Sequence, residues 1–186
     1  MSKLPRRSEK FRAAHRLQAL TGFLLSLLGV CLVAYVVFFL WLVPVRVAGA
    51  SMTPAFLEGE IVLVDRAAKL WKVPRRGDVV EFSDPQFGGT LLKRIIALPG
   101  ETVDIADGQV YIGGRPLDER AYVQNPGSSP DLESVTVPAG CVFVLSDNRE
   151  TVYDSRADEV GCIAYDDIRG VVRFRIYPRT KLAFYY

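Results

Sequence analysis

Residues 20–43 read LTGFLLSLLGVCLVAYVVFFLWLV and contain no charged side chain. At a rise of ~1.5 Å per residue, a helix of this length crosses the ~30 Å hydrocarbon core of a bilayer with room for tilt. Aromatic residues gather toward its C-terminal side, as in the aromatic belt of a membrane–water interface; they are Tyr35, Phe38, Phe39 and Trp41. The run predicts a transmembrane helix over 20–43 between a tail, 1–19, and a larger domain, 44–186.

The two flanks of this apolar run differ in charge. The near C-terminal flank holds only Arg46, whereas the N-terminal flank sets the single acid Glu9 against Lys3, Arg6, Arg7, Lys10, Arg12 and Arg16. The positive-inside rule then predicts a single-pass protein of the plasma or inner membrane, with a cytoplasmic N-terminus and an extracytoplasmic 44–186 domain. A cleaved signal peptide is the alternative, because Ala48-Gly49-Ala50 resembles an A-x-A site, but signal peptides have shorter apolar cores of ~7–15 residues.

Composition and charge exclude several classes of protein. The net charge of +2 becomes about −3 when the charged residues of the tail are left out, so the 44–186 domain has no nucleic-acid footprint. His15 is the only histidine, and the acidic residues lack the spacing of a calcium loop, so we expect no metal and no cofactor. Cys31 lies in the apolar run, while Cys141 and Cys162 in the outer domain are compatible with free thiols or a disulfide.

The 44–186 domain has the pattern of short strands separated by Gly and Pro turns. Asp107-Gly108 predicts a hairpin turn, 124–133 a polar loop, and 165–168 a single helical turn. Strands are predicted at 60–65, 77–82, 90–98, 102–105, 109–112, 135–137, 141–145 and 170–176. The fold class is therefore mainly β, with a transmembrane helix followed by a compact antiparallel β domain.

Ser51, a few residues beyond the apolar run, is the candidate nucleophile. Because His15 lies on the other side of that run, a Ser-His-Asp triad cannot form, and Lys93 is the best candidate base. A lysine acts as a base only when it is neutral, which requires burial to lower its pKa from about 10.4. The apolar neighbours of Lys93 favour such burial, and strand alternation turns Arg94 to the opposite face.

Four stretches carry further motifs. In order they are Gly49-Ala50-Ser51-Met52-Thr53-Pro54, Arg76-Gly77-Asp78-Val79-Val80, KRIIALPGE at 93–101, and Ser146-Asp147-Asn148-Arg149 followed by Asp154-Ser155-Arg156. Behind an N-terminal anchor, these stretches resemble the boxes of bacterial type I signal peptidases, membrane-anchored serine proteases with a Ser-Lys dyad. The resemblance runs from the apolar helix to about Pro178.

This resemblance implies an activity and a set of site residues. The fold would be that of a signal peptidase core, with Ser51 as acylating nucleophile, Lys93 as general base, and an oxyanion hole at the backbone of Gly49 and Ser51. The substrates would be exported preproteins, bound as an extended strand and cleaved after small-x-small sites. Pocket-lining positions correspond to Met52, Phe56, Leu91 and Leu92, and site-shaping positions to Arg94, Ser146, Asp147, Asn148, Asp154, Ser155 and Arg156. We expect Asp154 to pair with Arg156 or Arg94.

The chain departs from the pattern of this family at three positions. Gly49 replaces a serine that supports the oxyanion hole in some members, so we expect the loop at Gly49 to be reshaped. Ser146 replaces a glycine. Val152 replaces a serine whose hydroxyl orients the lysine, and we expect either Thr151 or Ser155 to supply that hydroxyl, or Val152 to hold Lys93 by packing.

Three alternative functions remain compatible with parts of the sequence. A specialised conjugative-transfer peptidase would share the dyad and differ in substrate. An SOS-response repressor autopeptidase would share the dyad but needs a DNA-binding domain where this chain has an apolar helix. A membrane-anchored β-rich binding module with weak or no catalysis would treat the four boxes as scaffold, and Val152 favours it.

Overall fold

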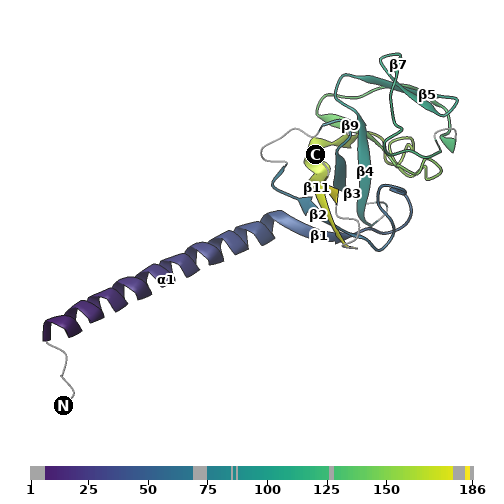
Figure 1. Ribbon diagram of the computed structural model, residues 1–186. Helices are drawn as coiled ribbons and strands as arrows, with labels where there is room; N and C mark the ends of the chain where they lie inside the picture. Colours follow the sequence, from purple (N-terminus) through teal and green to yellow (C-terminus); the bar gives the residue numbers. More distant parts are fainter. Residues whose placement is uncertain are drawn as a thin grey trace. The chain divides into compact units, whose positions relative to one another are not determined.

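The computed structural model (Figure 1) describes residues 7–68, 75–84, 86, 88–125, 128–177 and 183–184, the side chains of 7–14 and 183–184 excepted. The first six residues of the predicted tail, with Lys3 and Arg6, lie outside the described residues. The chain divides into two compact units, Met1–Leu40 and Trp41–Tyr186. This division falls slightly before the predicted boundary at Val43/Pro44.

The N-terminal unit is built on one helix, α1, which spans Arg7–Trp41. Its segment His15–Trp41 has a mean hydropathy of 2.8, is long and apolar enough to cross a membrane, and is not buried inside the structure. Apolar residues lie on all sides of α1, whereas a helix that covers a soluble core has one apolar face. The predicted helix is therefore present, and its composition suits a lipid environment.

The predicted helix is too long at its C-terminal end. Leu42 and Val43 belong to strand β1, Leu42–Arg46, which pairs antiparallel with β2, Ile61–Asp65. The residue before a proline disfavours helical backbone, so Val43 before Pro44 is extended. Because β1 lies at the edge of its sheet, Pro44 is tolerated there without a backbone N–H.

The larger sheet of the Trp41–Tyr186 unit carries most of the strands. Its order is β1-β2-β11-β3-β4-β9-β10, and β12 pairs with β11. The remaining members are β3 (Val79–Asp84), β4 (Gly89–Ala97), β9 (Cys141–Leu145), β10 (Ile163–Ala164), β11 (Ile168–Tyr177) and β12 (Ala183–Phe184). A 3₁₀ turn, Tyr165–Asp167, precedes β11 at the predicted helical turn.

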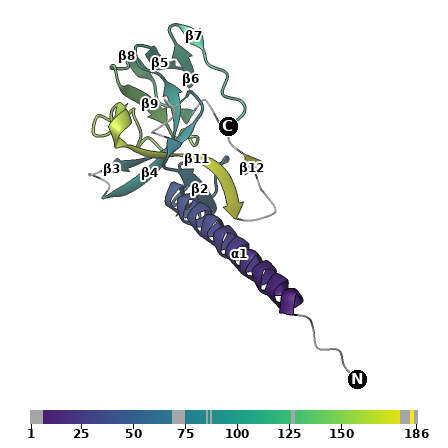
Figure 2. The same ribbon diagram turned by 90° about the vertical axis from the view of Figure 1, so that its left-hand side faces the viewer.

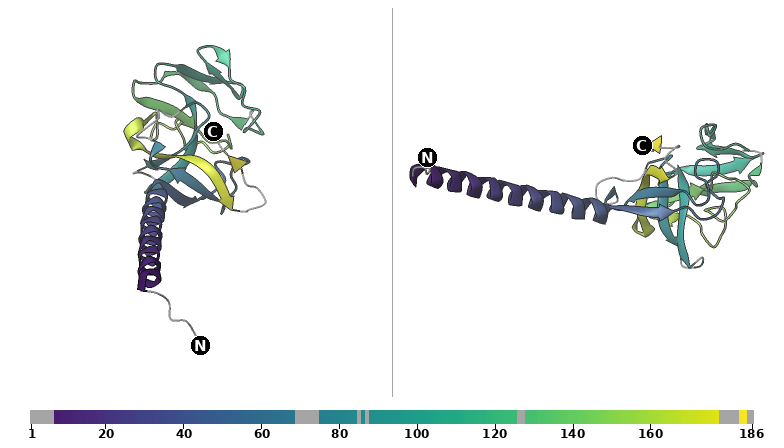
Figure 3. Two further views of the ribbon diagram at one scale, coloured as in Figure 1. Left: turned by 60° about the vertical axis from the view of Figure 1, so that its left-hand side comes forward. Right: turned by 60° about the horizontal axis from the view of Figure 1, so that its bottom comes forward.

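Strand β11 is long and curved, as Figures 2 and 3 show, and it pairs with both β2 and β3. Its register shifts along both pairings, between Val172 and Phe174 for example. Gly170 permits the close approach to β2, because an added Cβ would lie 2.6 Å from Val64 Cγ1 and 2.8 Å from Asp65 O.

The smaller sheet lies at the end of this unit away from β1 and β2 (Figure 1) and has the order β7-β6-β5-β8. Its strands are β5 (Thr102–Ala106), β6 (Gln109–Ile112), β7 (Arg115–Pro116) and β8 (Leu132–Thr136). The predicted turn at Asp107-Gly108 is confirmed, with φ of 49° and 77° as a tight hairpin turn requires. The predicted strand 135–137 starts too far along the chain. The strand observed there, β8, begins at Leu132, inside the segment 124–133 that was predicted to be a polar loop.

Three apolar clusters form the core of the unit. One joins the two sheets, since Ile96 and Ala97 at the end of β4 pack with Val103 of β5 and Phe143 of β9. Another contains Val62 and Val64 of β2 with the loop that follows Ser51, through Met52 and Phe56. The third lies between β3, β4, β9 and β11. The fold is mainly antiparallel β, as predicted, and residues of strand β4 pack in or against all three clusters.

Candidate active site

Lys93 lies on β4 next to the end of β9, and the register explains its partner. Arg94 pairs with Leu145 across the ladder, so the next residue, Ser146, comes level with Lys93. Lys93 Nζ donates a hydrogen bond of 2.9 Å to Ser146 Oγ. Both residues are buried, at 2% and 0% exposure. Among the described residues, Lys93 has no ion pair with a carboxylate.

The surroundings of Lys93 change its acidity. Burial lowers the pKa of Lys93 from 10.5 to about 8, and Arg156 acts in the same direction, while the charges of Asp154 and Asp147 oppose the shift. A substantial fraction of the amine is therefore neutral at mildly alkaline pH. A lysine accepts a proton only in its neutral form, so this neutral fraction allows Lys93 to act as a base.

Ser51 begins a short turn that is held by the loop after β9. Asn148 N donates to Ser51 O at 2.9 Å, and Asn148 Nδ2 donates to Ala50 O at 3.3 Å. The segment Ser146–Asn148 thus contacts both Lys93 and Ser51. The hydrogen bonds of the described residues include no direct bond between Ser51 and Lys93; catalytic hydrogen bonds are often long without substrate.

The backbone around Ser51 leaves donors available. In the described part of the chain, the hydrogen bonds of this turn do not use the Ser51 N–H; those present are Thr53 N to Ala50 O and Phe56 N to Met52 O. Gly49 has φ +73°, a conformation in which a side chain is strained. The loop therefore has a conformation at this position that suits glycine.

Four of the residues predicted to shape the site form two buried ion pairs, Arg94–Asp147 and Arg156–Asp154. Arg94 Nε and Nη2 bind Asp147 at 2.7 and 2.6 Å, and the guanidinium lies over the Tyr122 ring at 4.3 Å from its centroid. Burial raises the pKa of Asp147, although Arg94 opposes this effect. In the described hydrogen bonds, Arg94 thus has partners of its own, and Lys93 is the residue that binds Ser146.

Asp154 pairs with Arg156, one of the two partners predicted for it. Arg156 Nε and Nη2 donate to the two Asp154 oxygens at 2.8 and 2.7 Å, and Ser146 N donates to Asp154 Oδ2 at 2.8 Å. Burial alone would raise the pKa of Asp154, but these partners together lower it. Asp154 therefore fixes the backbone of the residue that contacts Lys93.

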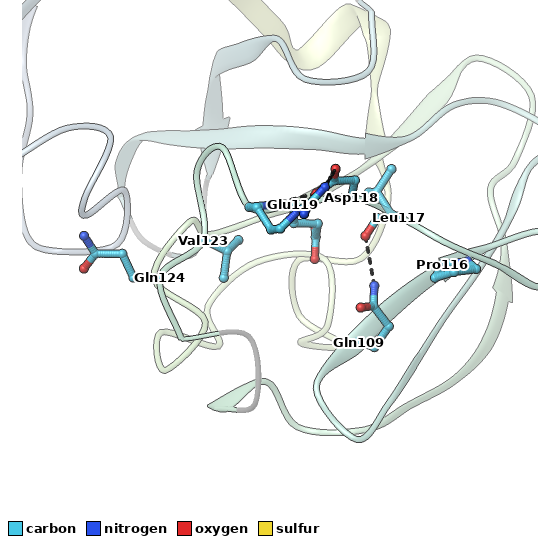
Figure 4. Close-up of a pocket in the computed structure, with 8 residues that line it drawn as sticks. Gln109, Pro116, Leu117, Asp118, Glu119, Val123 and Gln124 are labelled. Atoms are coloured by element: carbon cyan, nitrogen blue, oxygen red, sulfur yellow. Dashed lines mark hydrogen bonds and ion pairs between the residues drawn. The ribbon is translucent and has the colours of Figure 1, made fainter.

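The sequence reasoning missed Arg149 as a site residue. Its side chain is fully buried and binds Glu119 through two hydrogen bonds of 2.9 and 2.6 Å, while its Nε donates to Ser146 O at 3.0 Å. Its place in the fourth motif could have identified Arg149 as a site residue. The partner of Arg149, Glu119, lies outside all four motifs. Glu119 also lines a pocket of about 520 Å³ beside the smaller sheet (Figure 4), which contains none of the predicted site residues.

The predicted substitutes for the lysine-orienting hydroxyl are incorrect. Val152 is 49% exposed, so it does not hold Lys93 by packing. Ser155 Oγ accepts a hydrogen bond from Val144 N at 2.9 Å, and the described hydrogen bonds of Thr151 use its backbone. The hydroxyl on Lys93 comes from Ser146 instead, because the β4–β9 register brings that residue alongside.

The predicted pocket residues divide into two groups. Met52 and Phe56 are 1% and 0% exposed and belong to the core, so their side chains have no surface that a substrate reaches in this structure. Leu91 and Leu92 are partly buried, and Leu92 packs against the same cluster as Met52. Leu92 thus packs beside the residue that follows Ser51 in the sequence.

The described residues contain no group of three His, Cys, Asp or Glu side chains arranged for a metal ion. Cys141 and Cys162 are free thiols in the structure. Burial raises the pKa of Cys162, and the nearby Cys141 adds to this shift.

A family model and relatives of similar sequence agree on one family. The model of the signal peptidase family, peptidase S26, matches residues 20–177. Signal peptidase I U of Bacillus subtilis is 34% identical over 162 residues, 81% of this chain and 86% of that protein. The probable signal peptidase I-1 of Synechocystis is 33% identical over 146 residues, 74% of this chain and 72% of that protein. A crystal structure of a signal peptidase I from Enterococcus faecalis is 36% identical, with a TM-score of 0.45, and covers 54% of this chain and 97% of that one.

Proposed function

Because the chain belongs to the signal peptidase family S26, we propose that it removes signal peptides with a catalytic dyad of Ser51 and Lys93. Members of this family are serine endopeptidases, and signal-peptide removal is the activity that membership supports for this chain. The observation that carries the dyad is the buried Lys93 amine, whose pKa is lowered to about 8 and which has no carboxylate partner among the described residues.

In the first half of the reaction, neutral Lys93 takes the proton of Ser51 Oγ as that oxygen attacks the scissile carbonyl carbon. The resulting oxyanion accepts hydrogen bonds from the Ser51 N–H and the backbone at Gly49. Collapse of the tetrahedral intermediate breaks the C–N bond, and Lys93 gives its proton to the leaving amine. The signal peptide is then an ester on Ser51, and the mature protein leaves with a new N-terminus.

In the second half, Lys93 takes a proton from a water molecule as the water oxygen attacks the ester carbon. The C–O bond to Ser51 breaks, the proton returns to Ser51 Oγ, and the signal peptide leaves with a terminal carboxylate.

Backbone N–H groups that stabilise the oxyanion are worth ~3 kcal/mol each in acyl transfer. The unused Ser51 N–H in the described hydrogen-bond network supports this assignment.

For the substrate, we propose an exported preprotein bound as an extended strand and cut after a small-x-small site. The partly buried Leu92, which packs against the cluster of Met52, supports a shallow apolar pocket beside Ser51. A leucine at the −1 position of the preprotein should then block cleavage. Efficient cleavage of that variant would contradict the proposed specificity.

We also propose that α1 anchors the protein in the cell membrane with the catalytic unit outside. The apolar segment His15–Trp41 and the basic residues that precede it support this arrangement. In intact spheroplasts, an added protease should digest the catalytic unit. Protection of that unit until the membrane is permeabilised would reverse the proposed topology.

The dyad is tested by incubating detergent-purified protein with a preprotein and following release of the mature protein. Ser51→Ala and Lys93→Ala should each abolish cleavage while thermal unfolding remains cooperative. The matched control is Arg120→Ala, whose side chain is 89% exposed and should leave the rate unchanged. Substantial turnover by Lys93→Ala would refute the dyad.

A further inference from the structure

The base in this site has a hydroxyl as its hydrogen-bond partner. Lys93 Nζ donates to Ser146 Oγ at 2.9 Å, and both side chains are buried. A neutral amine has two N–H donors and one lone pair, and the lone pair must face Ser51 to take its proton. A hydroxyl that accepts one N–H limits rotation of the amine, so the lone pair spends more time in the productive direction.

Ser146 is itself held firmly enough to act as a reference point. Its N–H donates to Asp154 at 2.8 Å and its carbonyl accepts from Arg149 at 3.0 Å. Each of these partners is fixed in a buried ion pair, with Arg156 and Glu119 respectively. The position of the hydroxyl therefore depends on a rigid backbone and not on a free loop.

The same segment also holds the nucleophile. Two residues beyond Ser146, Asn148 N donates to Ser51 O at 2.9 Å. One short stretch of chain thus fixes the base through a side chain and the nucleophile through its backbone. Ser155 and Val152 do not serve Lys93, since Ser155 Oγ binds Val144 N and Val152 is 49% exposed.

We propose that Ser146 is the positioning residue that orients Lys93 toward Ser51. The proposal rests on the proposed Ser51–Lys93 dyad. The serine at 146 and the valine at 152 are then two parts of one change. Ser146, at the end of β9, supplies the orienting hydroxyl that Val152 in the exposed part of the loop lacks.

The test compares Ser146→Ala with wild type in preprotein cleavage by the full chain in detergent. Ser146→Ala keeps the backbone bonds to Asp154 and Arg149 and loses only the hydroxyl. We expect kcat to fall about 10- to 100-fold, part of the ~10²- to 10⁴-fold that a general base contributes, with KM nearly unchanged. We also expect the midpoint of the pH profile of kcat/KM to move below pH ~8, because the ammonium form loses an acceptor.

Two controls and a second variant make the result decisive. Thr151→Val and Val152→Ser should stay within about twofold of wild type, because the hydroxyl on Lys93 comes from Ser146. Should Ser146→Ala not fold, Ser146→Gly removes the same hydroxyl and is expected to show the same loss and the same direction of the pH shift.

Three outcomes would overturn the proposal. The first is a hydroxyl-free variant with wild-type kcat. The second is a midpoint that rises toward 10.5, which would mean that the change had merely opened the site to water. The third is a several-fold gain from Val152→Ser. Turnover by Lys93→Ala would overturn the dyad and this proposal together, whereas an inactive Lys93→Ala with a fully active Ser146→Ala would overturn this proposal alone.

Discussion

Two kinds of buried basic side chain, arginine and lysine, lie in or beside the loop after β9, and they have different partners. Three guanidinium groups, with side chains at most 8% exposed, each bind a carboxylate through two hydrogen bonds, in the pairs Arg94–Asp147, Arg149–Glu119 and Arg156–Asp154. Within the described part of the chain, the amine of Lys93, equally buried, binds only the hydroxyl of Ser146. An arginine cannot shed its proton, so its burial requires an anion. A lysine can lose its proton, so a lysine that is buried without an anion becomes neutral more readily and can act as a base.

The largest effect on activity is expected when the amine of Lys93 is replaced by a guanidinium, which removes the difference between the two kinds of side chain. Lys93→Arg should lower kcat/KM by ~10³-fold or more, because arginine stays protonated and cannot accept the proton of Ser51. Preprotein cleavage measured up to pH 10 checks this, since no alkaline rescue is expected. Recovery of the rate at high pH would show that another group serves as the base.

The arginine side of the contrast concerns stability. Arg149→Met leaves the carboxylate of Glu119 buried without its charged partner, so unfolding free energy should fall by ~3–5 kcal/mol. Chemical denaturation measures the loss. The matched control is Arg120→Met, whose pair with Asp118 is 89% and 62% exposed and should contribute nothing measurable. Equal effects of the two substitutions would mean that burial of the Arg149 pair has no energetic consequence.

Lys93 should reduce stability, by a smaller amount. Its pKa is about 8 in the folded protein and 10.5 as the ordinary value, so below pH 8 the unfolded chain binds the proton more tightly. Lys93→Met should therefore raise unfolding free energy by roughly 1–3 kcal/mol at pH 7. This gain should shrink between pH 8 and 10.5, as the unfolded lysine also loses its proton. A gain that is independent of pH would point to packing instead.

The sequence predicted most of the fold because its signals are local. Alternating apolar residues and the Asp107-Gly108 turn located most of the strands that form the two sheets. The strand Leu42–Arg46 was missed, because its apolar residues continue those of α1, and only pairing with β2 distinguishes them. The two-residue strands β7 and β10 were missed for a related reason, since they are defined by their partners.

The candidate site was predicted where a motif carries the chemistry, and less well where partners come from distant strands. Ser51, Lys93 and the Asp154–Arg156 pair came from short motifs. The Lys93–Ser146 contact depends on the β4–β9 register, and the Arg149–Glu119 pair joins two loops that lie far apart in the sequence. Met52 and Phe56 were predicted to line a pocket, but three-dimensional packing places them in the core.

The central claim is that a buried amine without a carboxylate partner is the base, and the pH dependence of kcat/KM for preprotein cleavage tests it most directly. The rate constant for the free enzyme should rise with pH through a midpoint near 8, the pKa of Lys93 in its buried site. A midpoint near 10.5, the ordinary value for an exposed lysine, or a profile that is flat between pH 6 and 10, would contradict the account.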